Sequence, residues 1–566
     1  MNQLHGNRML VAMGLALMLG TSLYGSVYGE GEVDFEKQIA PLLSKHCLEC
    51  HSANQPSGNL NLTSLPTILT GGESGAAIVP GKEAESHLVE RVANGEMPPE
   101  KNGKKQPLAA EEVDLLKQWV KQGAKWPEGR LLDPFATTTE KRGGRDWWAF
   151  QPIVKPDLAK FGGEAAKGNA IDAFVKAGLA KRGMELAPPA DPRTLVKRLY
   201  GDLVGLPPPM DVVEKFAADP SDAAYEKLVD ELLASRHFGE RWGRYWLDVV
   251  RFAETNGYER DAVKPFAWKY RDWVIAAIND DKPYNEFVVE QLAGDEVPNR
   301  NEASVVATGF IRLGTWDDEP NDQKEYIYER LEDMVHATST AFLGLTVKCA
   351  RCHDHKFDPI LQTDYYRLAA TFWPGPIQGG VLGGPTKEQL GFDVLGWTDL
   401  GREAAPLHLL KKGDPHRPMQ EVSAGPLSFV PAAAKEFEGP AADAKTTGRR
   451  LQFAKWIVDE KNPLTARVAV NRLWLHHFGE GIVRSPDNLG FAGQKPTHPE
   501  LLDYLASELM AGGWKQKRLH KLMVLSQTYR QSSLHPRQEE FAEKDPTNLN
   551  WWRANRQRLD AETLRD

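Results

Sequence analysis

The four cysteines of the 566-residue chain fall in two copies of one pattern, in which two cysteines three positions apart are followed at once by a histidine. The copies are Cys47, Cys50 and His51 near the N-terminus, and Cys349, Cys352 and His353 in the middle of the chain. Thiols at this spacing form thioethers to the edge of a porphyrin, and the adjacent imidazole binds its iron. The pattern therefore predicts two covalently attached c-type haems, with His51 and His353 as proximal ligands.

A zinc site is the alternative for the second copy, because His355 adds a fourth possible ligand two residues after His353. Zinc sites normally combine pairs of ligands from separate segments, and four ligands within seven residues would crowd the metal. Haem is therefore the favoured interpretation. We expect His355 to lie on the proximal side, where it hydrogen-bonds a haem propionate or the proximal imidazole.

Met97 is the predicted second ligand of the first haem. It is the only methionine between His51 and Trp126, and the two prolines that follow it hold it in a loop. A thioether opposite a histidine raises the reduction potential relative to two histidines. The alternative ligand is His87, on a short helix before that loop.

The second haem has no evident ligand for its other face. His336 lies opposite the apolar stripe of its helix, so a solvated side chain is favoured there. His477 and His498, from the C-terminal region, are the other candidates. We expect the iron to be five-coordinate or to take a ligand from the C-terminal region. An open face would suit oxidation of a substrate, whereas a closed one suits electron transfer.

The first 29 residues have the features of a secretory signal peptide. Arg8 precedes an apolar run over residues 9–20, and small residues suitable for cleavage follow. No later stretch offers about 18 uninterrupted apolar residues, so we expect no transmembrane segment after cleavage. Because c-type haem is attached outside the cytoplasmic membrane in bacteria, the signal and the two cysteine patterns together predict a periplasmic or secreted protein.

The charge balance limits the classes of partner. The chain has 69 basic and 78 acidic residues, a net charge of -9, and no polybasic run. A nucleic-acid partner is therefore not expected. The expected partner is a redox protein of the periplasm or envelope, and the oligomeric state is left undetermined.

Helical periodicity dominates the chain and predicts a mainly α fold with three domains after the signal peptide. These are a cytochrome c-like module (33–128), a helical central domain (147–375) and a helical C-terminal domain (405–566), with a polar linker at 129–146. A Gly- and Pro-rich crossover (374–444) contains a possible strand at 407–410. The clearest helical stripes cover residues 33–46, 109–122, 171–181, 192–203 and 223–234. The final run, 551–565, is also predicted to be helical, and the lack of a stop signal suggests a truncated C-terminus.

Other functions have some support in the sequence. Asp248, Arg251 and Glu254 are weak candidates for acid-base groups on one face of a helix at 240–253. The aromatic residues from Trp242 to Trp273 would form a surface platform for sugar rings, which supports glycan binding or cleavage as an alternative. A scaffold protein of the envelope is a third hypothesis.

Several longer motifs resemble one known family. Residues 71–75 (GGESG), 79–81 (VPG) and 97–99 (MPP) are similar to the planctomycete cytochrome c domain. Residues 239–242 (GERW), 291–295 (QLAGD), 343–346 (LGLT), 462–468 (NPLTARV) and 528–531 (TYRQ) resemble the secreted planctomycete proteins in which that domain precedes a second cytochrome-like domain and a C-terminal domain of unknown function. The resemblance implies this architecture and haem binding more firmly than any reaction.

Overall fold

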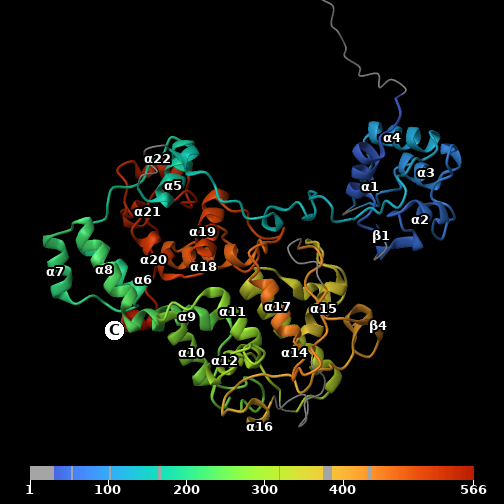
Figure 1. The fold of residues 1–566 in the computed structure, drawn as a ribbon. Coiled ribbons are helices and arrows are strands. Elements are labelled where there is room, and N and C mark those ends of the chain that lie inside the picture. Colours follow the sequence, from blue (N-terminus) through green and yellow to red (C-terminus); the bar gives the residue numbers. More distant parts are fainter. Residues whose placement is uncertain are drawn as a thin grey trace, which may run out of the picture. The chain divides into compact units, whose positions relative to one another are not determined.

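The computed structural model describes residues 31–52, 55–100, 103–162, 168–317, 319–373, 385–430 and 436–565 (Figure 1). These residues are mainly helical, as predicted, and their strands form two small antiparallel pairs. The chain divides into two compact units, residues 1–132 (unit 1) and residues 133–566 (unit 2). The predicted signal peptide lies outside the described residues. Among the helices of the described chain, none is long and apolar enough to cross a membrane.

Unit 1 is a small helical module around one apolar cluster. Trp119 is almost completely buried there, and the ring centroid of Phe35 lies 4.3 Å from that of Trp126. The helices predicted at 33–46 and 109–122 are confirmed, although the first begins as a π-helical turn. The elements of unit 1 are η1 (Phe35–Ile39), α1 (Ala40–His46), β1 (His51–Ser52), β2 (Gln55–Pro56), η2 (Ser57–Asn59), α2 (Leu65–Thr70), η3 (Glu83–Glu85), α3 (His87–Ala93) and α4 (Ala110–Lys121).

Unit 2 contains most of the helices. Its first part comprises η4 (Trp148–Phe150), η5 (Leu158–Phe161), α5 (Ala170–Ala180), α6 (Pro192–Leu203), α7 (Met210–Ala218), α8 (Asp222–Ala234), α9 (Arg236–Val249), α10 (Ala267–Asn279), α11 (Tyr284–Ala293), α12 (Glu302–Ala307), α13 (Gly309–Arg312), α14 (Gln323–Thr338), η7 (Ser339–Leu343), η8 (Val347–Arg351) and α15 (Gln362–Phe372). Its second part comprises α16 (Lys387–Leu390), β3 (Leu407–Leu410), η9 (Lys411–Gly413), β4 (Pro418–Val422), α17 (Arg449–Ile457), α18 (Thr465–Phe478), α19 (Pro499–Ala511), α20 (Lys517–Val524), α21 (Gln527–Arg530), α22 (Gln538–Lys544) and α23 (Ala561–Arg565).

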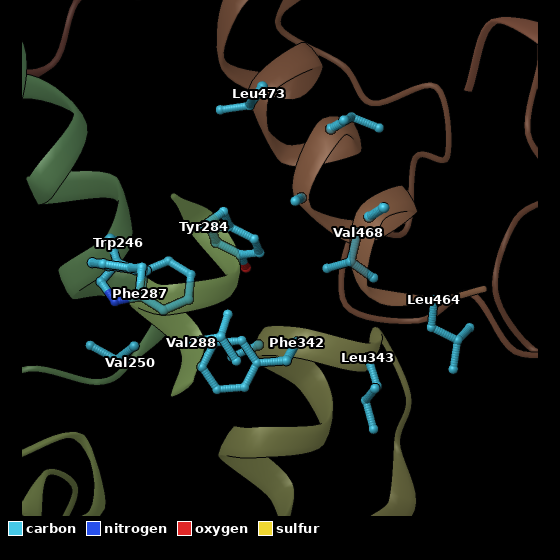
Figure 2. Close-up of a cluster of buried hydrophobic side chains, with 14 of the residues drawn as sticks. Trp246, Val250, Tyr284, Phe287, Val288, Phe342, Leu343, Leu464, Val468 and Leu473 are labelled. Atoms are coloured by element: carbon cyan, nitrogen blue, oxygen red, sulfur yellow. The ribbon is translucent and has the colours of Figure 1, made fainter. Parts of the chain in front are cut away.

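The central and C-terminal regions of the sequence share one hydrophobic core. Figure 2 shows side chains of α9, α11, η7 and α18 that belong to this core. The ring centroid of Trp246 lies 5.1 Å from that of Phe287 and 5.6 Å from that of Phe342. On the α18 side, Arg472 donates to the carbonyl oxygen of Thr340 at 2.7 Å. The two regions therefore form one packed body although they read as separate domains in the sequence.

Local sequence predicted several helices of unit 2 but not its last segment. The stripes at 171–181, 192–203 and 223–234 correspond to α5, α6 and α8. The prediction of a helix over 551–565 is wrong, because only α23 is helical there. Trp551 adopts a left-handed φ of 52°, and its ring and that of Trp552 are buried. This turn brings both indoles into the core, which a continuous helix would not do.

The Gly- and Pro-rich crossover contributes a strand pair. The predicted strand at 407–410 is confirmed as β3, which pairs antiparallel with β4. Gln362 of α15 donates to the carbonyl oxygen of Leu410 at 2.9 Å and fixes this pair to the helix. Residues 374–384 and 431–435 of the crossover lie outside the described residues.

Candidate haem-attachment sites

The first cysteine pattern forms a turn directly after α1. The amide of Cys47 donates to the Leu43 carbonyl at 2.9 Å, and the amides of Cys50 and His51 donate to the Cys47 carbonyl at 3.2 and 3.0 Å. These bonds keep the two cysteines and the histidine on one turn of backbone. Cys47 packs against the apolar cluster, and burial raises the pKa of its thiol to about 12.

His51 is suited to bind iron in its neutral form. Burial lowers the pKa of its imidazole, because the charged form loses hydration. Its Nδ1 atom is buried and has no hydrogen-bond partner in the parts of the chain that the structure describes. A neutral imidazole is the form that coordinates metals.

Met97 lies in a loop after α3, as predicted. Its amide donates to the Arg91 carbonyl at 3.2 Å, and its side chain is half-buried against the same apolar cluster as Cys47. His87, the alternative ligand, is on the exposed first turn of α3, where its Nδ1 lies 3.3 Å from a carboxylate oxygen of Glu90. This arrangement favours Met97, whose role as ligand stays a prediction.

The second cysteine pattern lies at the surface of unit 2. Cys349 and Cys352 are exposed, whereas the intervening Ala350 is fully buried beneath them. The guanidinium of Arg351 bonds to Glu325 at 2.5 Å and to Glu332 at 3.1 Å, both on α14. The non-cysteine residues therefore anchor η8, and both thiols remain accessible.

The exposed His353 has one ring nitrogen available for a metal. Its Nδ1 lies 2.6 Å from the carbonyl oxygen of Asp354. Because a carbonyl oxygen only accepts hydrogen bonds, Nδ1 carries the proton and the lone pair of Nε2 is available. A backbone carbonyl commonly orients metal-binding imidazoles in this way. The two thiols and this imidazole fit a c-type haem.

His355 has a structural contact that the pattern did not reveal. Its side chain is 4% exposed, and its Nδ1 accepts from the amides of Asp358 at 2.9 Å and Phe357 at 3.3 Å. Burial lowers the pKa of this imidazole to about 4. The side chain therefore holds the loop that follows the cysteine pattern.

The zinc alternative finds no geometric support. A zinc site at the second pattern would need His355 to converge with the exposed thiols of Cys349 and Cys352, but its ring is buried within the following loop. Across the described ranges, no group of three or more His, Cys, Asp or Glu side chains is placed to hold a metal ion.

Two candidates for the other face of the second haem, His477 and His498, pack against other residues of unit 2. His477 is buried on α18, with its Nε2 atom 2.8 Å from Nδ1 of His520. His498 is buried with its ring centroid 4.9 Å from that of Trp551, and its Nε2 lies so close to Gly178 that a Cβ there would clash at 2.6 Å. Burial lowers the pKa of His477 to about 3 and that of His498 to about 4.

The expectation that His336 is solvated holds only for part of its side chain. The side chain is half-buried, and its Nδ1 atom is buried without a hydrogen-bond partner in the described chain. Residues four apart share one helix face, so His336 lies beside Glu332, which bonds Lys348 of η8 at 2.7 Å. The ammonium of Lys348 also contributes to the lowered pKa of His336, after burial. His336 therefore stands on the face of α14 that meets the second cysteine pattern.

The weak acid-base candidates are not on one helix, which corrects the sequence analysis. Helix α9 ends at Val249, and Arg251 beyond it adopts a left-handed φ of 53°. Arg251 pairs with Asp333 at 2.6 Å, whereas the exposed Glu254 pairs with Arg271 at 3.3 Å. Asp248 is exposed on the last turn of α9. A catalytic role for these residues stays a prediction.

The predicted aromatic platform is wrong for the helical residues of the stretch. Trp242, Trp246, Tyr270 and Trp273 are buried on the inner faces of α9 and α10 in the core of unit 2. Tyr258, Phe266 and Trp268 of the same stretch are exposed. The glycan alternative therefore keeps only these three aromatic side chains, and it stays a prediction.

Three family models match the chain in the predicted order. The model described as planctomycete cytochrome C matches residues 47–101, and two described as proteins of unknown function match residues 170–375 (DUF1549) and 449–566 (DUF1553). The three matches confirm the predicted order, a planctomycete cytochrome c segment followed by two segments of unknown function. No curated protein and no solved structure matches it.

Both cysteine patterns lie in segments that the family models match. The first pattern and Met97 lie within the matched cytochrome segment, for which the implied cofactor is haem c. The second pattern lies within the central segment. The central and C-terminal segments, matched separately, are the two parts of one compact unit.

Proposed function

We propose that the protein is an exported dihaem c-type cytochrome that transfers electrons between its two haems and a redox partner in the periplasm or envelope. The observation that supports this most strongly is the second pattern. Its two thiols are exposed on one anchored turn, and the adjacent His353 keeps a ring nitrogen available for iron. A surface turn of this kind suits both haem attachment and exchange with a partner.

The side chains around the first pattern suit a high-potential site. Cys47 and Cys50 would hold the haem, His51 and Met97 would bind its iron, and the haem would supply one-electron exchange. The apolar cluster beneath Cys47 and Met97 keeps water away from that side. The lowered pKa of His51 keeps its imidazole neutral at pH 7.

The test is a spectroelectrochemical titration of the full exported chain. We expect two one-electron steps. Met97→Ala should lower one potential and abolish the sulfur-to-iron charge-transfer band, because the thioether stabilises the reduced iron. Met210→Ala is the control, since Met210 is 72% exposed and lies in unit 2. If His87→Ala has these effects and Met97→Ala has none, the assigned ligand is wrong.

The second haem would suit electron transfer if both faces of its iron carry a protein ligand. It would suit a coupled oxidation if one face is open. We expect it to be low-spin in the wild-type protein, with His336 as ligand, because this histidine stands on the helix face that meets η8. His336→Ala should convert it to a high-spin iron that binds carbon monoxide when reduced. His477→Ala is the comparison and should leave the spin state unchanged, since its ring bonds to His520.

A different result would redirect the proposal. An iron that turns high-spin in His477→Ala but not in His336→Ala would contradict the assignment to α14. An iron that is high-spin in the wild-type protein would show an open face and support oxidation of a substrate in the central region.

A further inference from the structure

Unit 2 contains a second candidate site, which shares no lining residue with the second cysteine pattern. A cavity of about 290 Å³ is bordered by α6, α9, the end of α18, α21 and the segment 551–559. Its residues come from the two family segments of unknown function, 170–375 and 449–566. Ligand sites often form where two such parts of a chain meet.

The cavity wall is strongly cationic. Five basic side chains line it, namely Lys197, Arg198, Arg241, Arg553 and Arg558, against one carboxyl group, that of Asp202. Arg198 donates to the backbone carbonyl oxygens of Tyr529 and Gln531, and the carboxyl group that its charge acts on is that of Asp202. Arg241 is paired with Asp560.

Asp560 offsets the charge of Arg241, and the one lining carboxyl group, that of Asp202, offsets little of the remaining charge. Asp202 accepts a hydrogen bond from the Tyr529 hydroxyl at 2.6 Å, and burial raises the pKa of its carboxyl group to about 7. A group with this pKa is partly neutral near pH 7. The electrostatic potential of the cavity is therefore positive, which favours an anionic ligand.

The wall also contains hydrogen-bond donors that lack acceptors. Nε of Arg241, Nε of Arg553 and Nε1 of Trp551 are buried and without a partner among the described residues. Trp551 is 3% exposed. A buried donor left without an acceptor costs about 1–3 kcal/mol, and native structures contain few of them. Three at one cavity indicate a ligand that accepts hydrogen bonds.

The size and the remaining wall define the ligand further. The volume is close to the lower end of small-molecule sites and exceeds that of a single water. Phe478, Trp551 and Leu559 add apolar surface beside the guanidinium groups. We propose that this cavity binds a small organic oxyanion, whose phosphate, sulfate or carboxylate head meets the arginines while its carbon skeleton lies against the aromatic wall.

The test is calorimetric titration of the full exported protein with inorganic phosphate, inorganic sulfate and benzoate in separate experiments. We expect saturable binding of at least one probe, and an increase in the melting temperature at saturating concentration. Comparison of the three probes identifies the head group. A cavity that holds only water would give no saturable heat with any of them, which would overturn the proposal.

Matched variants connect the binding to this cavity. Arg553→Gln should weaken binding about tenfold or more, because a charge-assisted hydrogen bond is lost. Lys197→Gln, at the exposed rim, should weaken it several-fold without affecting folding. Arg260→Gln is the control with the same charge change, since Arg260 is exposed and pairs with Glu319 away from the cavity. Binding that is equal in all four proteins would overturn the proposal.

Asp202→Asn is a variant that should strengthen anion binding, whereas the variants above should weaken it. The amide oxygen can still accept from the Tyr529 hydroxyl, while the negative charge facing the cavity is removed. We expect tighter binding of the anionic probe in this variant. Weaker binding would contradict the proposed anion site.

Discussion

Replacement of both Cys349 and Cys352 by alanine is expected to remove one of two covalently attached haems from the exported protein. Both thiols are exposed, and the turn that carries them is anchored by other residues, including the buried Ala350 and the ion pairs of Arg351 with α14. The change should therefore abolish attachment without unfolding unit 2. Intact-protein mass after expression in a haem-attaching host measures it as the loss of one haem increment.

The corresponding replacement of Cys47 and Cys50 is the matched comparison. It should remove the other increment and leave the second in place. Far-ultraviolet circular dichroism of both variants checks that the helices remain. A wild-type protein with a single increment that survives loss of Cys349 and Cys352 would take the central region out of the electron-transfer proposal.

The parts of this molecule that sequence predicts are those set by local pattern. Two thiols and an imidazole on one turn are local, so the cysteine patterns needed no tertiary information. The same holds for α6, where Asp191 caps the helix and Pro192 opens it. Strand β3 was also predictable, because a short apolar run in a Gly- and Pro-rich segment favours a strand over a helix.

Other features depend on contacts between distant segments and could not be predicted. The apolar face of α9 was recognised, but only its packing against α18 and α20 shows that its tryptophans lie in the core. The cavity cations come from α6, α9 and the segment after Trp551, and no local motif connects them. A left-handed residue such as Arg251 is a helix end that periodicity alone does not reveal.

The contacts of Arg450 also join distant segments of the sequence, and they connect the two family segments of unit 2. Its side chain is fully buried on α17 and bonds to both carboxylate oxygens of Asp295 at 2.7 and 2.8 Å. It also bonds to Glu296 at 3.2 Å and to Asp399 at 3.3 Å. Burial lowers the pKa of the Arg450 guanidinium, but the three carboxylates raise it by more. The pKa therefore lies well above its usual value. One cation thus contacts three buried acids and offsets part of their charge.

Arg450→Met is therefore expected to destabilise unit 2 strongly. Removing one partner of a buried ion pair leaves uncompensated charge and costs about 3–5 kcal/mol. The midpoint of urea unfolding, followed by tryptophan fluorescence, should fall accordingly. Arg193→Met is the control, because Arg193 and its partner Glu214 are exposed and such pairs contribute about 0–1 kcal/mol.

The loss should also depend on pH, and its direction follows from the carboxylates. Burial already raises the pKa of the Glu296 carboxyl group to about 7, and the Arg450 guanidinium opposes this rise, so its removal should raise the folded-state pKa further above the unfolded value. An acid with a higher pKa in the folded state than in the unfolded state holds its proton more tightly when folded. As the pH rises and protons become scarce, the free energy of unfolding therefore decreases. The destabilisation by Arg450→Met should therefore be larger at about pH 8 than at about pH 5. Combining Arg450→Met with Asp295→Asn and Asp399→Asn should restore part of the loss at the higher pH. A loss that is independent of pH, and that is not relieved by these amides, would show that Arg450 stabilises unit 2 by packing rather than by charge.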